Sequence, residues 1–202
     1  MTYRVLVLVS GSGTLLQSLI DARNEGRLDA ELVAVGADLE CAGIERAKKS
    51  GIATFVHPMP RLLRRGTDER LAWDSALADQ IAAFTPDLIV SAGFMKLLDE
   101  PCMTRFGDRI INTHPALLPA FPGAHAVRDA IAAGATTTGA SIFWVNDGVD
   151  TGELITQEAV DVLPGDDEAS LHERIKVVER RLLVDVVNDL ARTHRTTTGE
   201  TE

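Results

Sequence analysis

An amide, an imidazole and a carboxylate stand in two short stretches of this 202-residue sequence. Asn112 and His114 lie two residues apart at the end of an apolar run, and Asp150 lies in a glycine-rich turn. Acyl transfer needs an oxyanion stabiliser, an imidazole that carries a proton, and an acid that favours the charged imidazole. If the two stretches meet in space, the sequence predicts an enzyme.

The positions of these groups strengthen the prediction. Side chains alternate along a strand, so Asn112 and His114 point the same way, at the carboxyl edge where open α/β sheets hold their active sites. A histidine that only caps the strand is the alternative for His114. An ordinary polar hairpin would also explain the composition of residues 146–152. Asp147 is the weaker candidate there, because it can be a turn residue alone.

A second glycine-rich turn, residues 9–14, lies between the first apolar run and the first helical pattern. Glycines permit a tight turn, and the N–H groups at a helix N-terminus can bind an anion. Leu16 stands where a dinucleotide fingerprint has its third glycine, and no lysine follows as in a nucleotide-binding P-loop. A phosphate monoester therefore fits better than a dinucleotide, with a ligand-free connection as the alternative.

Short apolar runs alternate with helical patterns along the chain. Strands are predicted at residues 5–9, 32–36, 54–57, 88–91, 109–113, 139–145 and 153–159. Helices are predicted at residues 14–24, 42–49, 68–84, 101–106, 124–133 and 170–192. This order predicts an α/β fold, a three-layer, mostly parallel twisted sheet with helices on both faces. We expect one domain over residues 1–192 and a disordered tail over residues 193–202.

Composition limits the partners. The formal net charge of −10 disfavours a nucleic-acid partner, because a polyanion needs a basic face. Cys41 and Cys102 have no metal-binding spacing, so no metal is expected. No apolar run approaches the length of a membrane span, and the chain starts without the pattern of a secretory signal. We expect a cytoplasmic protein with no membrane partner, either a monomer or a homodimer.

Three segments, taken in order, resemble the glycinamide ribonucleotide formyltransferases, folate-dependent enzymes of purine synthesis. They are SAGFMKLL at residues 91–98, NTHPALLPAFPG at residues 112–123 and DTG at residues 150–152. The resemblance covers residues 5 to about 190 and implies the Rossmann-like formyltransferase fold. It also implies transfer of a formyl group from the co-substrate 10-formyltetrahydrofolate to the primary amine of glycinamide ribonucleotide, without a metal.

The resemblance assigns roles to individual residues. Asn112 would polarise the formyl carbonyl and His114 would donate a proton. Asp150 would favour charged His114 and relay the proton that the amine loses. The residues implied for the ribonucleotide are Gly13, Thr14, Leu15, Lys176, Val177, Val178 and Glu179. Of these, Gly13, Thr14 and Leu15 would hold its phosphate, and Glu179 would face its ribose hydroxyls. Those implied for the folate are Arg70, Met95, Lys96, Leu97, Leu98, Asn112, Asn146, Asp147, Gly148, Val149 and Asp150.

Four positions depart from the family's common pattern, and none is in the catalytic three. Thr14 and Leu15 stand where the phosphate loop often has Ser and Asn, so a side-chain donor is lost at Leu15. Lys96 replaces a common Arg, which weakens planar pairing with a carboxylate. Phe143 replaces a frequent His.

Other functions fit the sequence less well. Formyltetrahydrofolate hydrolase and methionyl-tRNA formyltransferase are related alternatives, but each carries a further domain that we do not expect in this chain. A non-catalytic folate- or nucleotide-binding protein on the same fold is the alternative from a different class. It predicts binding without turnover. A dehydrogenase is disfavoured by the missing third glycine.

Overall fold

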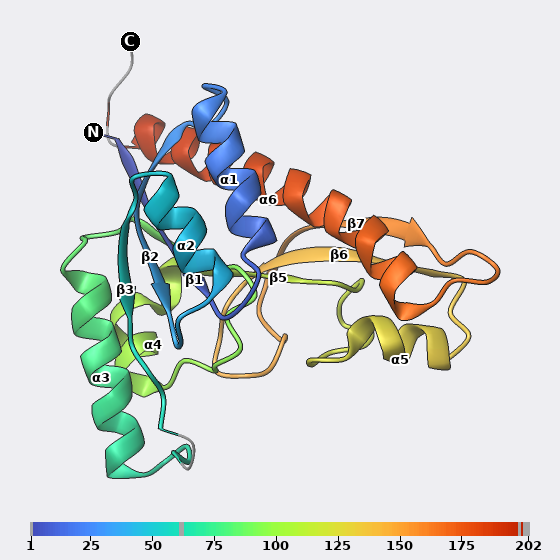
Figure 1. Cartoon of the computed structure of the whole chain (residues 1–202), viewed down its shortest axis with the longest axis horizontal. Coiled ribbons are helices and arrows are strands. Elements are labelled where there is room, and N and C mark those ends of the chain that lie inside the picture. The colour runs from blue at the N-terminus through green and yellow to red at the C-terminus, as the bar shows by residue number, and fades with distance from the viewer. Residues whose placement is uncertain (1, 61–62, 198, 200–202) are drawn as a thin grey trace.

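A computed structural model describes residues 2–60, 63–197 and 199, and it shows one seven-stranded sheet in the order β3-β2-β1-β4-β5-β6-β7 (Figure 1). The strands are β1 Tyr3–Val9, β2 Ala30–Ala37, β3 Ala53–Val56, β4 Leu88–Ser91, β5 Ile110–His114, β6 Thr137–Trp144 and β7 Leu154–Asp161. Strands β1 to β5 are parallel to one another. Strand β6 runs antiparallel to β5, and β7 runs antiparallel to β6. The predicted mostly parallel sheet is confirmed.

Helices cover both faces of the sheet. They are α1 Thr14–Asn24, α2 Ala42–Lys49, α3 Asp68–Ala82, α4 Glu100–Phe106, α5 Ala126–Ala132 and α6 Glu168–Thr197, with the 3-10 turn η1 Gly107–Arg109 before β5. Helices α1, α2, α5 and α6 contribute to the hydrophobic core on one face, and α3 and α4 to the core on the other.

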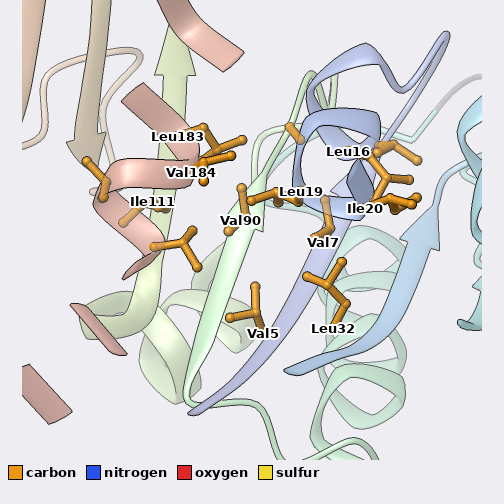
Figure 2. Close-up of a cluster of buried hydrophobic side chains, with 14 of the residues drawn as sticks. Val5, Val7, Leu16, Leu19, Ile20, Leu32, Val90, Ile111, Leu183 and Val184 are labelled. Atoms are coloured by element: carbon orange, nitrogen blue, oxygen red, sulfur yellow. The ribbon is translucent and has the colours of Figure 1, made fainter. Parts of the chain in front are cut away.

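Strand β1 explains how one sheet supports two cores. Its residues from Val5 to Val9 are fully buried, because both of its faces are covered. Alternate side chains enter opposite cores: Val5 and Val7 pack with α1 and α6, and Leu6 and Leu8 with α3. Figure 2 shows the first of these cores, with the labelled residues Val5, Val7, Leu16, Leu19, Ile20, Leu32, Val90, Ile111, Leu183 and Val184.

Helix α6 is longer than the sequence predicts. It continues to Thr197, so the expected disorder of residues 193–202 is wrong for residues 193–197. The hydroxyl of Thr193 donates to the Asp189 carbonyl at 2.9 Å, which satisfies it within the helix, and the His194 ring lies 5.1 Å from the Tyr3 ring. These contacts stabilise the polar C-terminal end of α6, which has no apolar face to bury. Residues 198 and 200–202 lie outside the described residues.

Candidate active site

One cavity of about 600 Å³ collects most of the candidate residues, including Asn112, His114 and Asp150. Its walls come from the glycine-rich turn after β1, the segment after β4, strand β5, the loop after β6, and α6. Strand β5 lies beside β4 in parallel register, with Ser91 opposite Asn112. The cavity therefore forms where neighbouring parallel strands end, as the sequence predicts for an open α/β sheet.

His114 is 4% exposed, and both of its ring nitrogens face oxygen acceptors. Nδ1 lies 3.4 Å from Oδ2 of Asp150, and Nε2 lies 2.8 Å from the carbonyl oxygen of Phe121. One oxygen acceptor therefore lies within reach of each ring nitrogen. The structure brings together His114 and the carboxylate that the sequence pairs with it.

Asp150 is held by its own loop and by the chain after β5. Its Oδ2 accepts a hydrogen bond of 2.7 Å from the Gly123 N–H, and its φ of +52° is left-handed. Within the loop, Oδ1 of Asn146 accepts from the Gly148 N–H at 3.0 Å and from the Thr151 hydroxyl at 2.9 Å. The carboxylate is thus placed before any ligand binds, which reduces the reorganisation that catalysis requires.

Asn112 lies on the same face of β5 as His114 and also lines the cavity. In the antiparallel pairing of β5 with β6, Asn112 lies opposite Phe143, whose side chain is 2% exposed. Phe143 replaces the histidine that is frequent in the family, and its phenyl ring packs in the wall of the cavity. The amide and the imidazole project from one rigid strand, whereas Asp150 reaches them from a loop.

The glycine-rich turn enters the same cavity through Ser10 to Leu15. Gly13 precedes the first residue of α1 and has a φ of +66°, a conformation that favours glycine. The predicted phosphate residues Gly13, Thr14 and Leu15 therefore lie in the cavity, at a helix N-terminus where backbone N–H groups lack helical partners.

Helix α6 provides the opposite wall. Lys176 and Glu179 line the cavity, but the predicted contacts Val177 and Val178 do not: Val177 is 63% exposed and Val178 packs against the core. His172 also lines the cavity, one helical turn before Lys176, and the sequence analysis missed it. The i, i+4 spacing from Lys176 is the signal that could have identified it.

Two groups on this wall have altered acidity. Burial raises the pKa of Glu179, which is 4% exposed, to about 7, although a hydrogen bond with Thr113 opposes the shift. Burial, and then the charge of Lys176, lower the pKa of His172. Near neutral pH, the protonated and the ionised forms of Glu179 are therefore both populated.

The segment after β4 carries the predicted folate residues Met95 to Leu98, all of which line the cavity. Arg70 on α3 lies outside that lining and is 5% exposed. Its guanidinium donates to the carboxylate of Asp74 and to the carbonyl of Leu97. Arg70 therefore supports a segment that lines the cavity, and its contact with the folate stays a prediction.

Lys96 lines the cavity and forms an ion pair with Asp38, its Nζ lying 3.2 Å from Oδ2. Asp38 follows β2 and is 5% exposed, and the sequence analysis missed it although it stands at the same edge of the sheet. The other predicted folate residues, Asn146, Asp147, Gly148 and Val149, also line the cavity. Among the described residues, no three His, Cys, Asp or Glu side chains are grouped to hold a metal ion.

Comparisons with known proteins place this arrangement in a family. Residues 3–187 match the formyl transferase family. The chain belongs to that family. This formyltransferase is 49% identical over 203 residues to a phosphoribosylglycinamide formyltransferase of Mycobacterium tuberculosis, covering 98% of this chain and 89% of that protein. The resemblance found in the sequence is confirmed.

A human protein and a solved bacterial structure are also similar to this formyltransferase. It is 36% identical over 180 residues to the human trifunctional purine biosynthetic protein adenosine-3, covering 89% of this chain and 17% of that protein. Its structure resembles that of glycinamide ribonucleotide transformylase 1 from Symbiobacterium toebii, with a TM-score of 0.88 at 38% identity, covering 95% of this chain and 89% of that one. No helix in the described part of the chain is long and apolar enough to cross a membrane.

Proposed function

We propose that this formyltransferase moves a formyl group from 10-formyltetrahydrofolate to the primary amine of glycinamide ribonucleotide. The products are formylglycinamide ribonucleotide and tetrahydrofolate, as de novo purine biosynthesis requires. The convergence of Asn112, His114 and Asp150 in a cavity that also contains a glycine-rich helix N-terminus carries this proposal. The three side chains can activate a carbonyl group, and the helix N-terminus beside them can bind an anion. This combination suits an acyl acceptor that carries a phosphate.

The reaction follows from the geometry of these three side chains. The amine nitrogen attacks the formyl carbon, and the carbonyl π electrons move to oxygen. The Asn112 amide and the His114 Nδ1–H stabilise this oxyanion, because the 3.4 Å contact with Asp150 leaves that N–H weakly bound. Asp150 accepts the proton that the attacking nitrogen loses and relays it to N10. The C–N10 bond then breaks with its electron pair remaining on N10, and the carbonyl re-forms as tetrahydrofolate leaves.

The ribonucleotide fits between the glycine-rich turn and α6. Its phosphate accepts hydrogen bonds from the backbone N–H groups of Gly13, Thr14 and Leu15 and is attracted by Lys176. The backbone supplies the donors, so the apolar side chain of Leu15 is tolerated. The carboxylate of Glu179 accepts hydrogen bonds from the ribose hydroxyls. Together these contacts orient the amine towards β5.

The folate fits between the segment after β4 and the loop after β6. Both carry exposed apolar side chains: Met95 is 69% exposed, Leu97 44% and Val149 47%. Exposed apolar groups that line a cavity suit a flat heterocycle and its aromatic linker. The backbone of residues 146–150 supplies polar groups for the edge of the heterocycle.

An assay of the purified protein with 10-formyltetrahydrofolate, with and without glycinamide ribonucleotide, tests the proposal. Release of tetrahydrofolate that depends on the ribonucleotide supports the transferase. Equal release without the ribonucleotide indicates a hydrolase, and binding of both compounds without turnover indicates a binding protein. Either of these results refutes the proposal.

We also infer the domain organisation, the location and the assembly of the protein. Residues 1–192 form a single domain, because both hydrophobic cores are built on one sheet. The protein acts on small molecules in the cytoplasm as a monomer or homodimer. Its net charge of −10 disfavours nucleic-acid and anionic membrane partners.

A further inference from the structure

Helix α2 packs behind the glycine-rich turn, on the side away from the cavity. The N–H of Gly43 donates to the carbonyl of Gly11 at 3.0 Å. Nε of Arg46 donates to the carbonyl of Ser12 at 2.8 Å. Two consecutive carbonyl groups of the turn are therefore bound from α2.

The direction of these carbonyls determines the direction of two N–H groups. In a trans peptide the C=O and N–H bonds point in opposite directions. When the Gly11 and Ser12 carbonyls face α2, the N–H groups of Ser12 and Gly13 point away from it. Ser12 and Gly13 both line the cavity, whereas Arg46 does not. A bond made behind the turn thus orients donors in front of it.

We propose that Arg46 is a positioning residue for the ribonucleotide phosphate. The inference rests on the proposed function, in which this turn binds the phosphate. Arg46 does not touch the ligand; it fixes the peptide between Ser12 and Gly13 so that its N–H faces the phosphate before binding. A preformed donor loses less conformational entropy when the ligand binds, and this increases affinity.

The shape of the guanidinium explains why an arginine serves here. While Nε holds the Ser12 carbonyl, Nη1 donates to Oε1 of Gln17 on α1 at 2.9 Å. One planar group therefore ties the turn to the helix that follows it. The fit is close, because a Cβ on Gly13 would lie 2.6 Å from Cα of Gly43. Helix α2 is thus a firm support for the turn.

Kinetics with Arg46→Ala test the inference. We expect the KM for glycinamide ribonucleotide and the inhibition constant of inorganic phosphate to rise together, by roughly tenfold, the usual effect of one hydrogen bond to a charged group. The kcat and the KM for 10-formyltetrahydrofolate stay within about twofold, because no residue that faces the folate has changed. Arg46→Lys keeps the charge but lacks the planar fork, so we expect a smaller rise in both constants.

Lys49→Ala is the matched control, since it removes one positive charge from the exposed end of the same helix. We expect both constants to stay at the wild-type values. An unchanged KM in Arg46→Ala, or an equal rise in Lys49→Ala, overturns the inference. If Arg46→Ala does not fold, Arg46→Lys decides, and wild-type constants in that variant overturn the inference.

Phosphate binding separates this inference from the proposed function. If the wild type shows no turnover of glycinamide ribonucleotide, the proposed function fails. Calorimetric titration of the wild type and Arg46→Ala with inorganic phosphate still tests the positioning role, because it needs no reaction. Tighter binding by the wild type supports that role, and equal affinities refute it.

Discussion

Replacing Glu179 with glutamine is expected to remove a pH dependence from the stability of the protein. Burial raises the pKa of this carboxyl from its usual 4.5 to about 7. Between these two values the folded protein keeps a proton that the unfolded chain releases. The free energy of unfolding therefore falls as the pH rises through this window. Glutamine has no such proton, so the variant lacks this contribution.

The size of the effect follows from the two pKa values. An interval of about 2.5 pH units corresponds to about 3 kcal/mol over the full titration. Between pH 5 and pH 8, about 2 kcal/mol of this contribution is lost. Glu179 is 4% exposed, so solvent screening reduces the value little.

Urea unfolding at pH 5 and pH 8 measures the effect in the wild type and in Glu179→Gln. Other titrating groups are common to both proteins and cancel in the comparison. Asp185→Asn is the control, because this carboxylate lies on the same helix with a 58% exposed side chain. We expect the wild type and the control to lose about 2 kcal/mol more than Glu179→Gln. Equal losses in all three proteins would refute the reasoning.

The remaining predictions concern the reaction and the folate segment. His114→Ala is expected to lower kcat by ~10²–10³ through loss of an oxyanion donor, while circular dichroism shows that the fold is kept; a near-normal kcat contradicts the mechanism. Asp150→Asn is expected to lower kcat and to leave the KM of each substrate nearly unchanged, because an amide cannot accept the proton that the attacking amine loses; an unchanged kcat in steady-state kinetics counts against its role. Asp74→Ala leaves the buried Arg70 charge unpaired, so urea unfolding is expected to show a loss of about 3–5 kcal/mol. It is also expected to raise the KM for the folate, and unchanged folate kinetics would show that the pair is structural only.

The fold could be predicted in most of its elements because local signals agree with the tertiary arrangement. Helices α1 and α2 begin and end where the sequence predicts, and so does strand β4. Glycine-rich or proline-containing turns separate buried apolar runs, and these are strong boundaries. The end of α6 was missed because its polar last turns are secured by contacts with distant residues such as Tyr3.

The candidate site could be predicted only where strand periodicity and the family resemblance reached it. Asn112 and His114 follow from the alternation of one strand. The acceptor at Nε2 of His114 could not be predicted, because the Phe121 carbonyl is presented by a residue with a φ of +53°, which is unusual for a bulky side chain. The buried ion pair of Arg70 with Asp74 was not predicted, although the i, i+4 spacing of the two residues is a local signal for it.

The left-handed backbone at Asp150 has a consequence for how this enzyme can change over evolution. Glycine, asparagine and aspartate adopt such a conformation at low energetic cost, and most other residues do not. Of these three, only aspartate carries a charge. Most substitutions at this position therefore remove the carboxylate and distort the loop at the same time. A single substitution here is expected to abolish activity instead of reducing it by degrees.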